Sequence, residues 1–127
     1  MSTAYSSFTS ESVQRMLAFL PRFEHGDFLD VEAQYLSGQY PPPVDQLTSE
    51  IYDSGFIFPF DWVDWHWRDK LAAVEDADIL TLRKLMTSFV RGDRFCGGAL
   101  AGLCSNGSVE RVLRRLKVLA ATGIEGL

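Results

Sequence analysis

The densest cluster of side chains that could do chemistry lies at residues 61–67, Asp-Trp-Val-Asp-Trp-His-Trp. If Asp61 caps a helix here, Trp62 and Trp65 share one face and His66 lies one turn beyond Trp62. An open aromatic groove of this kind binds a ligand ring or a partner side chain. The same residues could instead form an aromatic corner that packs into the core, and the sequence leaves both interpretations open.

A second candidate is the stretch at residues 91–98, Arg-Gly-Asp-Arg-Phe-Cys-Gly-Gly. Arg91 and Arg94 precede two glycines that can open a helix, where free N–H groups and guanidinium donors attract anions. The alternative is that Arg94 pairs with an upstream acid while Gly98 and Gly102 allow close helix packing. The candidate ligand- or partner-binding residues are therefore Asp61, Trp62, Trp65, His66, Arg91 and Arg94.

Catalytic and metal-binding patterns find little support. The two histidines, His25 and His66, lie in different segments, and their spacing is not that of a metal site. Cys96 follows two arginines that could lower its pKa, but the sequence places no histidine base beside it. We expect no metal, no cofactor and no catalytic residue, although this pattern alone does not decide whether the protein is an enzyme.

The cysteines and the apolar runs bear on localisation. If Cys96 and Cys104 lie on one helix, their Cα atoms are about 12 Å apart, too far for a disulfide. We therefore expect two buried, reduced thiols and a cytoplasmic protein. No basic and apolar leader is visible, and no apolar run approaches the ~20 residues of a membrane-spanning helix.

The clearest secondary-structure element is a final amphipathic helix that Ser108 is expected to cap. At 100° per residue its apolar side chains fall on one face, namely Val109, Val112, Leu113, Leu116 and Leu119. The other face carries the candidate nucleic-acid-binding residues Arg111, Arg114, Arg115 and Lys117. This basic face could contact phosphates, or it could be the solvated face of an ordinary αα-hairpin.

Charge is divided unevenly along the chain, whose net charge is −5. Residues 1–82 hold 14 acidic and 4 basic side chains, whereas residues 83–117 hold 2 acidic and 8 basic ones. Opposite charges attract, so this division affects how the two parts pack and which partners each attracts. We expect the surface to keep the two signs apart.

Apolar periodicity predicts further helices earlier in the chain. The first is expected to have Ser10 as its N-cap and to be stopped by Pro21. The prolines at 41–43 form a rigid break, after which a helix begins near Val44 and ends at Gly55. Residues 56–60, Phe-Ile-Phe-Pro-Phe, read as a buried crossing segment because Pro59 excludes a regular strand.

The second half is expected to be helical as well. One helix begins at Asp61 and continues past Trp67, and the next is capped by Asp78 and broken at Gly92 and Asp93. A short helix over residues 97–105 and an Asn106-Gly107 turn lead into the final helix. No alternating strand pattern competes with these assignments.

Four groups of residues form a pattern together. They are the turn from Tyr52 to Gly55 with Phe60-Asp61-Trp62, then Leu82-Arg83-Lys84-Leu85, then Asp93-Arg94-Phe95 with Gly98, and last Asn106-Gly107 with Leu113-Arg114-Arg115-Leu116. With this pattern, residues 51–119 resemble a family of small bacterial domains of unknown function, over about half of the chain. The resemblance implies a helical fold and supplies no catalytic residue.

We therefore expect one compact all-α domain over residues 1–127, with residues 1–9 flexible. Its five or six short helices end in an αα-hairpin, which packs on the helix at residues 82–89 and on the aromatics of residues 56–65.

For function, we expect a non-enzymatic binding or regulatory protein that acts through a charge-polarised surface and the aromatic cluster. It could modulate a bacterial partner complex, and its partner would be another protein or a second copy in a homodimer. One alternative is a nucleic-acid-binding module that uses the basic C-terminal helix. Another is a small enzyme that acts on an anionic small molecule near Arg94, with Asp61 and His66.

Overall fold

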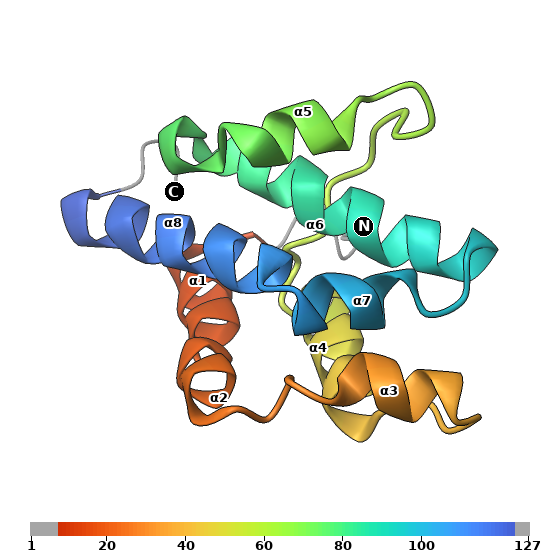
Figure 1. Cartoon of the computed structure of the whole chain (residues 1–127). Helices are drawn as coiled ribbons and strands as arrows, with labels where there is room; N and C mark the ends of the chain where they lie inside the picture. Colours follow the sequence, from red (N-terminus) through yellow and green to blue (C-terminus); the bar gives the residue numbers. More distant parts are fainter. Residues whose placement is uncertain (1–7, 124–127) are drawn as a thin grey trace.

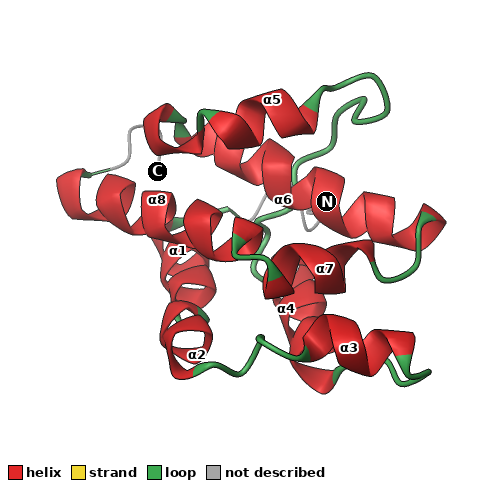
Figure 2. Cartoon of the chain, in the orientation of Figure 1, coloured by secondary structure: helices red, strands yellow, loops and turns green. Residues whose placement is uncertain are grey.

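Helices form the regular structure of residues 8–123, the part of the chain that the computed structural model describes. No strand occurs among these residues, and the all-α prediction is confirmed (Figures 1 and 2). None of these helices is long and apolar enough to cross a membrane. In chain order the elements are α1 (Ser10–Leu17), α2 (Leu20–His25), α3 (Val31–Leu36), α4 (Pro42–Asp53), α5 (Trp67–Ala72), the short 3₁₀ helix η2 (Val74–Asp76), α6 (Ile79–Phe95), α7 (Ala99–Ser105) and α8 (Ser108–Thr122).

The core forms where α6, α7 and α8 pack against one another (Figure 1). As predicted, α8 turns its apolar stripe inward, with Val109, Val112, Leu113 and Leu116 fully buried and Leu119 partly buried. Helix α6 contributes the buried side chains Leu82, Leu85, Met86 and Phe89 to this core. Burying one such side chain stabilises the fold by roughly 1.5–3 kcal/mol before conformational entropy is counted. Helices α1 and α2 and the turn η2 cover the rest of α8, while α5 packs on α6 and α3 on α7.

Arg83 on α6 holds the segment that crosses from α4 toward α5. Its guanidinium donates to the backbone oxygens of Gly55, Phe56 and Ile57 at 3.1, 3.1 and 2.9 Å. One turn further along α6, Thr87 Oγ1 accepts from the amide of Phe58 at 2.8 Å. Phe56 and Ile57 are fully buried, which confirms the crossing segment, whereas Pro59 at its far end is exposed.

Asp93 joins three segments at the end of α6. One carboxylate oxygen accepts from the Leu100 amide at the start of α7 at 3.0 Å, and the other accepts from the Tyr40 hydroxyl at 3.2 Å. The tight turn between α6 and α7 needs Gly98, whose φ is +89° and where a Cβ would lie 2.5 Å from the Tyr35 ring. Close packing by Gly98 is therefore confirmed, and the Leu100 amide is not free to bind an anion.

The structure corrects several expected helix boundaries. Pro21 does not end the first helix but stands in the first turn of α2, where a missing N–H costs nothing. Thr9, not Ser10, caps α1 through a capping box with Ser12. Of the segment expected to be flexible, residues 1–9, residues 1–7 lie outside the described part of the chain. Asp78 caps α6 as predicted, by accepting from the Thr81 amide at 2.8 Å.

Two expectations near α6 and α8 were also wrong. Gly92 and Asp93 do not break α6, which runs on to Phe95, because Asp93 finds its partners across the following turn. Ser108 is not a cap, since its amide donates to Asn106 Oδ1 at 2.9 Å after a Gly107 with φ of +89°.

Because the Arg83 guanidinium serves three carbonyl groups, we expect a large loss of stability when its geometry is changed. Arg83→Lys keeps the charge but cannot serve three carbonyls at once, so we expect the free energy of unfolding to fall by about 2–3 kcal/mol. Urea unfolding measures this. The exposed Arg94→Lys is the matched control and should change stability by less than about 0.5 kcal/mol. Equal effects of the two variants would contradict the role of Arg83.

Tyr40 predicts an alkaline loss of stability. Partial burial, and then the charge and hydrogen bond of Asp93, raise the pKa of Tyr40, which is 43% exposed, from 10.0 to about 12. Because the folded pKa is the higher one, the stabilisation is complete below pH 10 and is lost as the pH rises toward 12. Unfolding measured across this range should show a dependence that Tyr40→Phe reduces and Tyr52→Phe leaves in place. If the pH dependence of stability is the same in Tyr40→Phe as in the wild type, Tyr40 is not its source.

Candidate functional site

A groove of about 310 Å³ opens between the start of α5, the second half of α6 and the start of α7. We call it the α6–α7 groove. Its lining is largely apolar and consists of Trp62, Trp67, Arg68, Ser88, Phe89, Gly92, Phe95, Cys96, Ala99 and Leu103. A second hollow of about 370 Å³ shares part of this lining and continues along α7 toward Glu32 and Asn106.

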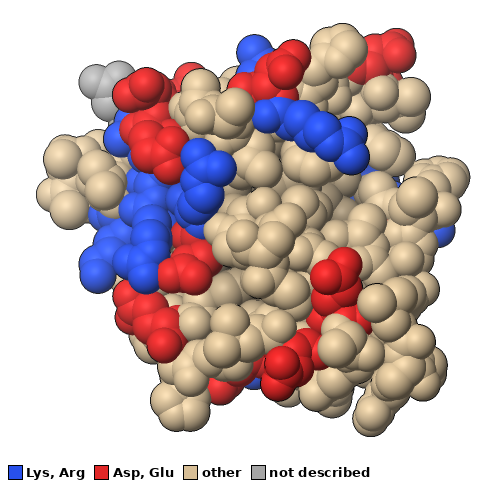
Figure 3. All heavy atoms as spheres, viewed as in Figure 1, with Lys and Arg blue, Asp and Glu red and all other residues tan. Residues whose placement is uncertain are grey.

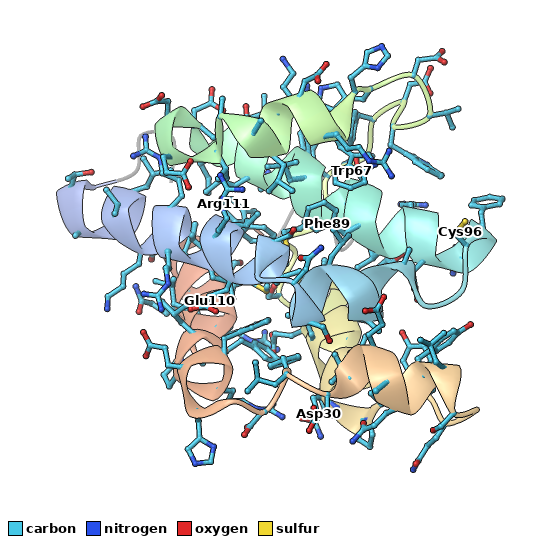
Figure 4. The ribbon with its side chains drawn as sticks, in the orientation of Figure 1. Asp30, Trp67, Phe89, Cys96, Glu110 and Arg111 are labelled. Carbon is cyan, nitrogen blue, oxygen red and sulfur yellow. The ribbon has the colours of Figure 1, made fainter. Side chains whose placement is uncertain are left out.

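Two aromatic pairs form the walls of the groove. The rings of Trp67 and Phe89 meet edge to face with centroids 5.4 Å apart, and Figure 4 shows this pair between α5 and α6. Trp62 and Phe95 pair at 5.7 Å and 37° nearer the end of α6. The Phe95 side chain is 80% exposed, which is unusual for a phenylalanine. The groove thus presents an aromatic surface to solvent.

Three polar side chains lie among these rings. Ser88 is only 3% exposed, and its buried Oγ has no hydrogen-bond partner. The guanidinium of Arg68 stacks on the Trp67 ring at 4.4 Å and makes no ion pair with any described residue. Cys96 contributes an exposed thiol at the end of α6 (Figure 4). Among the lining residues there is no carboxylate and no imidazole that could act as a general base.

The predicted cluster at residues 61–67 is placed differently from expectation. Residues 61–66 are not helical, and α5 begins only at Trp67, so Asp61 is not its cap. The tryptophans point to separate partners. Trp62 contacts Phe95, whereas Trp65 packs edge to face on Phe60 at 5.4 Å. These tertiary contacts override the weak helix propensity of an aromatic run.

Of the six predicted binding residues, only Trp62 lines the groove. The side chains of Asp61, His66 and Arg94 are exposed and lie outside its lining. Arg91 is partly exposed and does not line it either. The structure therefore does not join Arg94, Asp61 and His66 in this groove, as an enzyme site at Arg94 would require.

The basic face of α8 is largely engaged within the chain. Arg111 donates twice to the Glu75 carboxylate, at 3.0 and 3.1 Å, and lowers the pKa of that carboxyl. Arg114 contacts Glu110 and also Glu24 at 3.3 Å. Figure 3 shows the basic side chains over α8 bordered by acidic ones. The two parts of opposite charge are thus joined by ion pairs rather than kept apart.

The other two predicted nucleic-acid residues differ from each other. Arg115 is half-buried and donates to the backbone oxygen of Ala77 at 2.8 Å. Lys117 is exposed and lines a shallow hollow between α8 and α1–α2. Figure 3 also shows a largely uncharged surface around the end of α6, and acidic side chains over α7.

The cysteines do not share a helix, so their expected placement is corrected. Both are free, but Cys96 follows α6 and is exposed, while Cys104 is buried in α7. Burial raises the pKa of the Cys104 thiol, which makes it a poor nucleophile. The described residues contain no group of three or more potential metal ligands.

Sequence reasoning missed most of the groove because it ended α6 at Gly92. The spacing of Ser88, Gly92 and Phe95 is i, i+4, i+7, which is one face of a continuous helix. The same holds for Phe89 and Cys96 on either side of Gly92. Following this periodicity through the glycine would have placed these side chains together.

Comparison with known proteins identifies the family and nothing closer. A family model described as a family of unknown function (DUF6508) matches residues 8–122. The match extends the resemblance over residues 51–119 to most of the first fifty residues as well. No curated protein and no solved structure matches the chain. The chain belongs to this family of unknown function, DUF6508.

Proposed function

We propose that this chain is a non-catalytic binding protein whose α6–α7 groove receives an apolar side chain of a partner protein. The observation that carries this proposal is the exposed aromatic wall formed by Phe95 and Trp62. Aromatic side chains that fill a central pocket supply much of the affinity in protein interfaces. Burying an exposed phenylalanine stabilises a complex by roughly 1.5–3 kcal/mol.

The form of the site favours a partner segment over chemistry on a small molecule. The groove is open along the rim at Phe95, and the adjoining hollow extends it along α7. Ser88 and Cys96 are the lining residues that could act as nucleophiles, and no general base is found among the residues that line the groove. A site of this composition can hold an apolar group and cannot readily move protons.

Charge has a smaller part in this proposal. The net charge of −5 favours the approach of partners that carry a net positive charge. However, carboxylates within the chain pair with Arg111 and Arg114. This pairing argues against a strongly charge-polarised surface and against a nucleic-acid interface on α8. We therefore expect an association that survives rising salt, because apolar burial is not screened.

Peptides selected from a random library on the wild-type protein test this proposal. We expect them to carry an apolar or aromatic anchor and to lose at least about tenfold in affinity, measured by fluorescence anisotropy, on Trp62→Ala and Phe95→Ala. Leu36→Ala is the matched control, since Leu36 on α3 is 77% exposed and lies outside the groove. Equal affinity for all three variants would rule out the groove as the binding site.

A further inference from the structure

Ser88 is the feature of the groove that a purely apolar partner would leave unexplained. Its hydroxyl oxygen is buried and has no hydrogen-bond partner, although the residue lines the groove. Leaving a buried hydroxyl unsatisfied costs roughly 1–3 kcal/mol. A leucine or phenylalanine anchor has no group that could pair with this oxygen and would leave it unsatisfied.

An aromatic ring that carries a hydrogen-bond donor could both pack on the aromatic walls and pair with the Ser88 oxygen. The flat walls formed by Trp62, Trp67 and Phe89 suit another ring, in stacked or edge-to-face contact. The indole N–H of tryptophan or the phenol O–H of tyrosine can donate to a hydroxyl oxygen. A site that pairs such a group rejects the analogue that lacks it, because the protein atom is then left unpaired.

Arg68 indicates what lies next to that ring. Its guanidinium forms part of the groove lining, is exposed and has no carboxylate partner among the described residues. This sets it apart from Arg111 and Arg114, whose carboxylate partners lie within the chain. A guanidinium in this position suits a carboxylate, which it can bind through two parallel hydrogen bonds.

We propose that the partner segment carries a tryptophan or tyrosine anchor followed by an acidic residue, with the ring donor bound by Ser88 and the carboxylate by Arg68. This inference rests on the proposed function and specifies the partner's chemistry. It commits to a side chain of a protein segment, since the adjoining hollow along α7 leaves room for the chain on which the anchor is carried.

Capped hexapeptides Gly-Ser-X-Asp-Ser-Gly, with X as tryptophan, tyrosine or phenylalanine, test the ring donor. They are titrated into the labelled full chain and followed by the NMR amide shifts of residues 88–99. We expect the tryptophan and tyrosine peptides to bind about tenfold more tightly than the phenylalanine peptide. Ser88→Ala should abolish this preference, whereas Ser54→Ala, at an equally buried and unpartnered serine outside the groove, should keep it.

A change on the ligand side makes the test independent of folding. A peptide with N1-methyltryptophan keeps the ring and lacks the donor, so it should bind the wild-type protein no better than the phenylalanine peptide. Replacing the peptide's aspartate by asparagine should weaken binding about threefold on the wild type and leave Arg68→Gln unaffected.

The outcomes separate this inference from the proposed function. The polar anchor is overturned if the three peptides bind equally, or if the preference persists in Ser88→Ala. The role given to Arg68 is overturned if the asparagine peptide binds the wild-type protein as tightly as the aspartate peptide does. If Trp62→Ala and Phe95→Ala still weaken every peptide, the groove remains the binding site. An absence of shifts at residues 88–99 with all peptides contradicts the proposed function itself.

Discussion

The fold depends on how Arg83 satisfies the crossing segment. Buried extended backbone cannot bond to itself, and the carbonyl groups of residues 55–57 would be costly without a donor. The guanidinium supplies donors to all three and is enclosed by the rings of Phe8 and Phe58, at 4.1 and 5.2 Å. Burial lowers the pKa of Arg83, but a guanidinium stays charged in proteins. One side chain of α6 thereby fixes the path of the chain between α4 and α5.

This constraint also shapes the groove. The segment held by Arg83 and Thr87 leads directly into residues 61–67, so the position of Trp62 is set relative to α6. The opposite wall comes from the same helix, through Phe89 and Phe95. Helix α6 therefore both carries Phe89 and Phe95 and fixes the position of Trp62. A site built in this way loses little conformational freedom on binding, which raises affinity for a given contact area.

Sequence reasoning predicted those features that depend on local periodicity. The buried face of α8, the cap at Asp78 and the close packing at Gly98 follow from spacing, hydrogen-bonding groups and the small size of glycine. It failed where a partner distant in the sequence decides the outcome. Asp93 ends no helix because its carboxylate is used by Tyr40 and by the start of α7. The place of Trp62 in the groove was missed for the same reason, since no local pattern states that Trp62 meets α6. The α6 side of the groove was missed because the helix was expected to end at Gly92.

The residues that carry the family resemblance divide by what they do in this structure. Arg83, Asp93 and Gly98 each hold backbone in place, so a pattern containing them describes a fold more than an activity. Phe95 belongs to the same pattern, but its ring contacts Trp62 while most of its surface faces water. An exposed ring and an unsatisfied hydroxyl at Ser88 both cost free energy in the isolated chain. A single binding event that covers the ring and pairs the hydroxyl removes both costs, and this joint gain favours a partner with a polar aromatic anchor over one with an aliphatic side chain.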